Sequence, residues 1–179
     1  MRELSSDAIK KDLNAALTQY KETKLKHLED LKTLVRIPSI SFDGFPAEKV
    51  RESANATAKL MKARGLENVQ VIELDGAHPY VYGDWLHAPG KPTVLLYAHH
   101  DVQPIGREGL WKSRPFEPVE RDGRLYGRGT ADDKAGIVVH TATISSFLES
   151  VGKLPINVKV IIEGEEESGS AHLGEFVSK

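Results

Sequence analysis

Apolar side chains in the first part of the chain recur with the period of a helix. Between residues 7 and 34 they return every three or four positions, with lysines and glutamates between them, which predicts one long amphipathic helix. Pro38 ends this pattern, because the residue before a proline avoids the α region. Pro46 then stands where proline can begin a second helix, and Gly65 is placed to end it.

From Val69 onward the helical period is lost and β-branched residues dominate, which indicates strands. Strands are predicted near residues 69–74, 81–85, 93–97 and 157–162. The run that begins at Thr93 is continuously apolar after its first residue, which favours a central strand covered on both faces. Asp122-Gly123 lies between two short strand-like segments, and this dipeptide predicts a tight β-hairpin.

A further helix is predicted from Lys134 to about Ser150, with Val138 and Val139 on its buried side. Helices before and after buried strands indicate α/β layers. At 179 residues, of which 40% are apolar, the chain is long enough for one well-buried core. The pattern therefore predicts an α/β fold without internal repeats or linkers.

Composition narrows the possible chemistry. A net charge of −2 gives no basic field for nucleic acid or an anionic membrane, and no apolar run approaches the ~20 residues of a membrane span. Residues 1–6 are polar, so no secretory signal is expected and a cytoplasmic location is favoured. The chain has no cysteine, so any metal must be held by His, Asp, Glu or backbone oxygen.

Three motifs follow strand-like runs and carry such ligands. The first contains His99 and Asp101, which point the same way if the backbone is extended. Asp101 could then accept a hydrogen bond from the ring nitrogen of His99 that a metal does not use. A surface loop with two histidines is an equally good interpretation of this motif alone, and His100 should face the other way with a structural role.

The other two motifs are acidic. Asp132-Asp133 precedes the helix at Lys134, where acids often only cap a helix, and that interpretation is the stronger one for this motif alone. Glu165-Glu166-Glu167 follows the apolar run 157–162. Most charge runs are solvated loops, yet ligands of open α/β sheets collect at such strand ends. The remaining histidines are not part of a comparable acidic motif and are expected to be structural or exposed.

Together these motifs resemble the di-zinc exopeptidase and deacylase family that includes carnosine dipeptidase, acetylornithine deacetylase, succinyl-diaminopimelate desuccinylase and aminoacylase. The matching stretches are Tyr97–Pro104, Leu125–Lys134 and Glu165–Ser170. Val102-Gln103-Pro104 is more similar to the dipeptidase branch than to the deacetylases. The resemblance implies a zinc-exopeptidase-like three-layer α/β fold, in which a mixed sheet carries helices on both faces.

The resemblance also implies roles for particular residues. His99 would bind one zinc ion, Asp132 would bridge two, and Glu167 would bind the second. Asp101 would orient His99, and Glu166 would be the general base that activates the bridging water. Manganese or cobalt could replace zinc, and the peptide bond after Asp132 would be cis.

The family supplies a further carboxylate and a distant histidine after the third motif, together with a smaller dimerisation domain. None of these is present in residues 1–179. We therefore expect residues 1–179 to be the N-terminal part of one catalytic domain, truncated and inactive by itself, from a homodimeric cytoplasmic enzyme. Its substrate would be a small peptide, with no nucleic acid or membrane partner. Two alternatives are an N-acyl amino acid deacylase and a non-catalytic fragment with a structural or partner-binding role.

Overall fold

The helical period of the first part of the chain folds into α1 (Ser6–Val35), and Pro46 is the N-cap residue of α2 (Ala47–Ala63). The computed structural model describes residues 6–178. Gly65 follows α2 with a φ of +91°, a left-handed conformation that glycine adopts without a steric penalty. Both helices predicted in this region are therefore confirmed.

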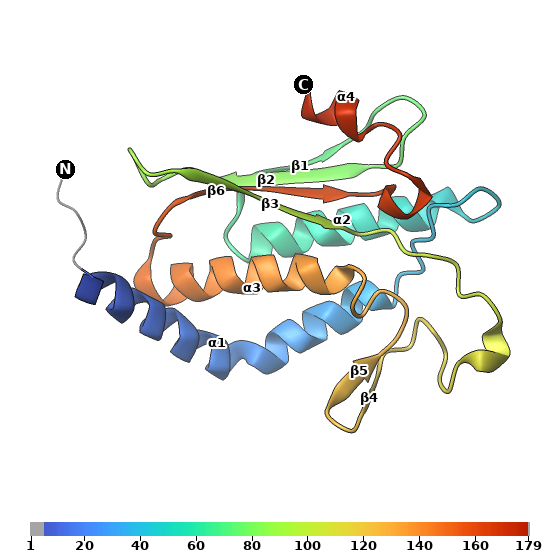
Figure 1. The fold of residues 1–179 in the computed structure, drawn as a ribbon, viewed down its shortest axis with the longest axis horizontal. Coiled ribbons are helices and arrows are strands. Elements are labelled where there is room, and N and C mark those ends of the chain that lie inside the picture. The colour runs from blue at the N-terminus through green and yellow to red at the C-terminus, as the bar shows by residue number, and fades with distance from the viewer. Residues whose placement is uncertain (1–5, 179) are drawn as a thin grey trace.

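A mixed four-stranded sheet forms the centre of the part of the chain that the structure describes (Figure 1). Its spatial order is β1-β2-β6-β3, from β1 (Glu67–Ile72), β2 (Tyr80–Trp85), β6 (Asn157–Glu163) and β3 (Thr93–His99). The pairs β1–β2 and β2–β6 are antiparallel, whereas β3 and β6 are parallel, with His99 opposite Glu163. The parallel pair therefore brings the residues that follow both strands to one edge of the sheet.

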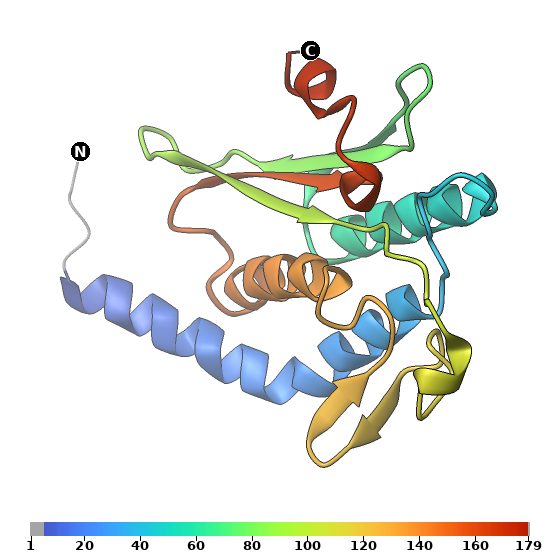
Figure 2. The ribbon, with the colours of Figure 1, turned by 45° about the vertical axis from the view of Figure 1, so that its right-hand side comes forward.

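Helices cover both faces of this sheet, as Figures 1 and 2 show. On one face lie α2 and α3 (Lys134–Val151), and α1 packs against α3. The short helix α4 (Leu173–Val177) lies on the other face, where the ring of Phe176 stacks on Tyr80 with centroids 4.5 Å apart. The predicted mixed α/β fold with helices on both faces is confirmed.

The remaining elements are short. The predicted hairpin is present as β4 (Val119–Arg121) and β5 (Arg124–Tyr126), with the left-handed turn conformation that its Asp-Gly sequence favours. Two 3₁₀ turns, η1 (Glu108–Leu110) and η2 (Glu166–Ser168), lie in the loops. No helix among residues 6–178 has the length and hydrophobicity needed to cross a bilayer.

Two expectations about burial are wrong. Within residues 6–178, β3 is an edge strand that pairs with β6 alone, and the side chain of Leu95 is 54% exposed instead of being covered on both faces. An apolar run cannot show whether a second neighbouring strand is present. Val139 on α3 is 61% exposed, although Val138 beside it is buried. Consecutive helix residues point about 100° apart, and only Val138 faces the core.

Candidate metal centre

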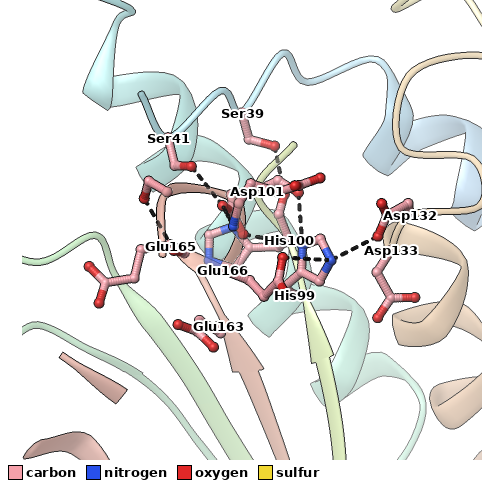
Figure 3. A network of polar contacts seen from close by, with 12 residues as sticks. Ser39, Ser41, His99, His100, Asp101, Asp132, Asp133, Glu163, Glu165 and Glu166 are labelled. Carbon is pink, nitrogen blue, oxygen red and sulfur yellow. Dashed lines mark hydrogen bonds and ion pairs between the residues drawn. The ribbon is translucent and has the colours of Figure 1, made fainter. Parts of the chain in front are cut away.

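The three motifs meet at the edge of the sheet where β3 and β6 end (Figure 3). His99 is the last residue of β3, and Glu166 begins the 3₁₀ turn that follows β6. Asp132 comes from the loop that precedes α3. The ends of parallel strands in an α/β sheet are where ligand sites commonly form, because the backbone turns away there and leaves side chains accessible.

The imidazole of His99 is held at one nitrogen and turned toward the acids at the other. Its Nδ1 lies 3.1 Å from the carbonyl oxygen of Asp101 and 3.2 Å from Asp101 Oδ1. Its Nε2 lies 3.1 Å from Asp132 Oδ1 and 3.7 Å from Glu166 Oε2. Burial of the ring lowers its pKa, but the contact with Asp101, the charge of Asp101 and the contact with Asp132 together raise the pKa of His99 to about 9.

Asp101 connects the first motif to the third. Its side chain is fully buried, and Oδ2 accepts hydrogen bonds from Ser41 Oγ at 2.7 Å and from the backbone N–H of Glu167 at 3.0 Å. Burial raises its pKa, but His99 and Ser41 outweigh this effect and hold the pKa of Asp101 below its usual range. Ser41 was not foreseen, since it is 60 residues away in sequence and belongs to no motif.

The two aspartates of the second motif have separate roles in the structure. Asp133 is the N-cap residue of α3 and accepts the backbone N–H of Gly136 at 3.1 Å, so the capping interpretation holds for this residue. Asp132 instead extends toward His99, and its side chain is 73% exposed. The peptide bond between them is cis, as the resemblance implied.

Buried Lys134 fixes the position of this second motif. Its Nζ donates to the carbonyl oxygens of Leu34 at 2.8 Å and Ile37 at 2.7 Å, at the end of α1. These acceptors lie near a helix C-terminus, where a cation is favourable. The loop that presents Asp132 is therefore tied to the helical layer.

The three consecutive glutamates point in different directions. Glu165 is 4% exposed and turns inward, where its carboxylate accepts the hydroxyl of Tyr80 at 2.8 Å and the backbone N–H of His172 at 2.7 Å. Glu166 extends toward His99 (Figure 3). Burial raises the pKa of Glu166, and the charges of Glu167 and other acids add to this against the opposing effect of His99.

The donor set fits a divalent cation. One ligand atom each from His99, Asp132 and Glu167 lies within 4.8 Å of the others, the one such group found among the described residues. An imidazole nitrogen with carboxylate oxygens is a ligand set that zinc accepts. The contact of His99 Nδ1 with Asp101 leaves Nε2 directed at the acids, in the orientation that a ligating histidine needs. The individual metal-binding roles stay predictions.

His100 is apart from this group, in line with the structural role expected for it. The residue is fully buried, and its Nε2 lies 2.9 Å from the carbonyl oxygen of Pro79. Burial lowers the pKa of His100 to about 4, so this ring is neutral at physiological pH. Contrary to the expectation from the sequence, His172 has an acidic neighbour, because its Nδ1 lies 3.1 Å from both carboxylate oxygens of Glu165.

Comparison with known proteins gives concordant matches. The family described as Peptidase family M20/M25/M40 matches residues 95–178. The chain is 37% identical over 171 residues to the Cys-Gly metallodipeptidase DUG1 of Candida albicans, an alignment that covers 88% of this chain and 35% of that protein. It is 42% identical over 101 residues to the human Beta-Ala-His dipeptidase, covering 56% of this chain and 20% of that protein.

Solved structures agree with these alignments. Human carnosine dipeptidase 1 superposes with a TM-score of 0.85 at 30% sequence identity, covering 92% of this chain and 37% of that chain. The dipeptidase Dug1p of Saccharomyces cerevisiae superposes with a TM-score of 0.83 at 26% identity, with the same coverage of 92% and 37%. The chain thus spans about a third of the length of DUG1 and of carnosine dipeptidase 1.

Proposed function

Because this chain belongs to peptidase family M20/M25/M40, we propose that its protein hydrolyses dipeptides at a metal centre to which residues 1–179 contribute His99, Asp132 and Glu167. The observation that carries the proposal is the convergence of these three side chains from three separate motifs. The dipeptidase names of the relatives support the substrate class. An N-acyl amino acid deacylase is the alternative to be tested.

Each residue has a distinct task in this proposal. Two zinc ions, when bound, supply Lewis-acid polarisation of the scissile carbonyl and lower the pKa of a shared water molecule. His99 Nε2 and Glu167 would each hold one ion, and the exposed Asp132 carboxylate, which lies beside His99, would be a ligand shared by both. Asp101 orients the His99 ring through Nδ1 and offsets the free-energy cost of burying that ring.

Glu166 is the proposed general base. Its carboxylate lies near His99 but outside the group of three ligands, so it is free to accept the proton of the attacking water. The raised pKa of Glu166 brings it closer to the operating pH, which favours proton transfer in both directions. The same residue would then deliver the proton to the leaving amine.

Further parts of the proposal concern the rest of the protein. Catalytic zinc usually has three protein ligands, so two zinc ions would need ligands from outside residues 1–179. We place residues 1–179 in one catalytic domain and expect them to be inactive alone, which accords with their covering about a third of the relatives. Manganese or cobalt in place of zinc, a homodimer and a cytoplasmic location complete the proposal.

Two neighbouring substitutions test the roles in the full-length protein that carries this chain. Glu166→Gln should lower the hydrolysis of Cys-Gly or β-Ala-His by at least ~10²–10⁴-fold while zinc content stays near wild type. Glu167→Gln should lower the zinc content itself. Exposed Glu22 on α1 provides the control, since Glu22→Gln should change neither quantity. Zinc loss in Glu166→Gln with retention in Glu167→Gln would reverse the two assignments, and turnover of N-acyl amino acids alone would favour the deacylase.

A further inference from the structure

Gln103 lies two residues beyond Asp101, on the segment that leaves β3. Its side-chain Nε2 donates to Glu167 Oε2 at 2.7 Å and to the backbone carbonyl oxygen of Glu167 at 3.2 Å. The backbone N–H of the same glutamate donates to Asp101 Oδ2 at 3.0 Å. Glu167 is therefore held at its N–H, its carbonyl and its carboxylate by two residues of one short segment.

The segment that carries Gln103 is itself fixed on two sides. Val102 is fully buried, forms a parallel bridge with Ile40 and donates its N–H to the carbonyl oxygen of Ser39 at 2.9 Å. The carbonyl oxygen of Pro104 accepts a hydrogen bond from Arg128 at 3.0 Å. Gln103 therefore extends from a backbone with neighbours immediately before and after it, which limits the positions that its amide can occupy.

The same segment also contacts the second motif. A Cβ atom added to Gly129 would lie 2.9 Å from Val102 Cγ1, so this glycine allows the loop that leads to Asp132 to approach closely. Arg128 precedes Gly129 and donates to Pro104. Residues 101–104 thus lie between the loop of Asp132 and the turn of Glu167, and they contact both.

The amide of Gln103 has the chemistry to orient a ligand without neutralising its charge. A neutral N–H donor fixes one carboxylate oxygen, Oε2, and leaves Oε1 of Glu167 for another partner. A lysine or arginine at this place would instead neutralise the carboxylate and compete with a cation. Asp101 acts in the same way on His99, because it holds one ring nitrogen and leaves the second directed at the acids.

We propose that Gln103 is a positioning residue that holds the Glu167 carboxylate in the orientation for cation binding, as Asp101 holds His99. The inference rests on the proposed function, since it assumes that Glu167 binds a metal ion. It assigns a role to the Gln of Val102-Gln103-Pro104. Partners of this kind fix the geometry of ligating groups, and their loss typically lowers metal affinity or activity ~10–100-fold.

Zinc affinity of the metal-free, full-length protein tests this role directly, by titration against a chelating chromophore. Gln103→Met keeps the length of the side chain but removes the donor, and Gln103→Asn keeps the amide but is too short by one methylene to reach Glu167. Both should bind zinc ~10–100-fold more weakly than wild type. Exposed Gln70 on β1 provides the matched control, and Gln70→Met should leave zinc affinity unchanged.

Kinetics separate positioning of the ligand from contact with substrate. Hydrolysis by Gln103→Met should fall at limiting zinc and recover at saturating zinc, with KM unchanged. Unaltered zinc affinity in both Gln103 variants would overturn the proposal, as would an equal loss in Gln70→Met or a raised KM at saturating zinc. If Gln103→Met does not fold, the zinc affinity of Gln103→Asn alone tests the positioning role. A wild-type protein without zinc affinity or dipeptidase activity would instead refute the proposed function.

Discussion

Gly164 lies at the end of β6, immediately before the three glutamates, and leaves no room for a side chain. A Cβ atom added there would lie 2.3 Å from the carbonyl oxygen of Pro79 and 2.9 Å from Nε2 of His100. The Pro79 oxygen is backbone and cannot rotate away, and it is also the hydrogen-bond partner of His100 Nε2 at 2.9 Å. Gly164→Ala must therefore displace the backbone or break this hydrogen bond.

The magnitude follows from these two effects. Overpacking by one carbon in a closely packed interior costs typically 1–3 kcal/mol. Leaving a buried donor or acceptor without its partner costs about 1–3 kcal/mol more. Gly164→Ala should therefore lower the free energy of unfolding by roughly 2–6 kcal/mol, a large part of the ~5–15 kcal/mol typical of native proteins. The φ of Gly164 lies outside the left-handed region, so the loss is steric.

Gly174 in α4 offers the same substitution with the opposite expectation, because a Cβ added there meets nothing within 4 Å. Gly174→Ala should be neutral or stabilising by up to ~1 kcal/mol, since alanine loses less backbone entropy in a helix. Urea unfolding followed by circular dichroism would measure both variants against wild type. Equal stability of Gly164→Ala and Gly174→Ala would refute the close packing of β6 against Pro79 and His100.

Two further predictions concern groups in and beside the site. In the metal-free protein, the pKa of His99 rises from 6.5 to about 9 on folding. The stabilisation that protonated His99 provides is therefore fully present below pH 6.5 and is lost as pH rises through about 9. Unfolding measured at several pH values should show the stability advantage of wild type over His99→Gln shrinking over that range. Glu165→Gln should lower the free energy of unfolding by about 1–3 kcal/mol, because the buried carboxylate accepts charge-assisted hydrogen bonds from Tyr80 and His172. A decrease in melting temperature no larger than that of Glu22→Gln would contradict this prediction.

Much of the candidate site was accessible from the sequence because its signals are local. The alternation of an extended chain placed His99 and Asp101 on one side, and the structure brings the His99 ring and the Asp101 carboxylate to 3.2 Å. The same period extends to Gln103, whose contact with Glu167 was not foreseen. Ser41 carried no such signal, because its hydrogen bond to Asp101 joins residues 60 positions apart and any small polar residue would suit the local loop.

The sequence by itself determined the elements. Helical and strand periods, prolines at helix ends and the Asp122-Gly123 turn act over a few residues, so they identify α1, α2, the strands and the hairpin without knowledge of distant neighbours. It also determined that three motifs with potential metal ligands follow or precede these elements. The sequence could not predict burial across the sheet. In β3, the exposure of Leu95 depends on which strands lie beside this strand.

The family resemblance implied different roles for Glu166 and Glu167, but only the tertiary structure showed the surroundings of the three consecutive glutamates. Glu165, Glu166 and Glu167 are chemically identical and share one local sequence, so no local rule separates them. Glu165 turns inward because Tyr80 and His172 supply donors there, whereas Glu167 meets an amide from the segment after β3. Hydrogen-bond donors from residues up to 85 positions away decide which of the three carboxylates is buried, because a buried charge is tolerated only where such partners exist.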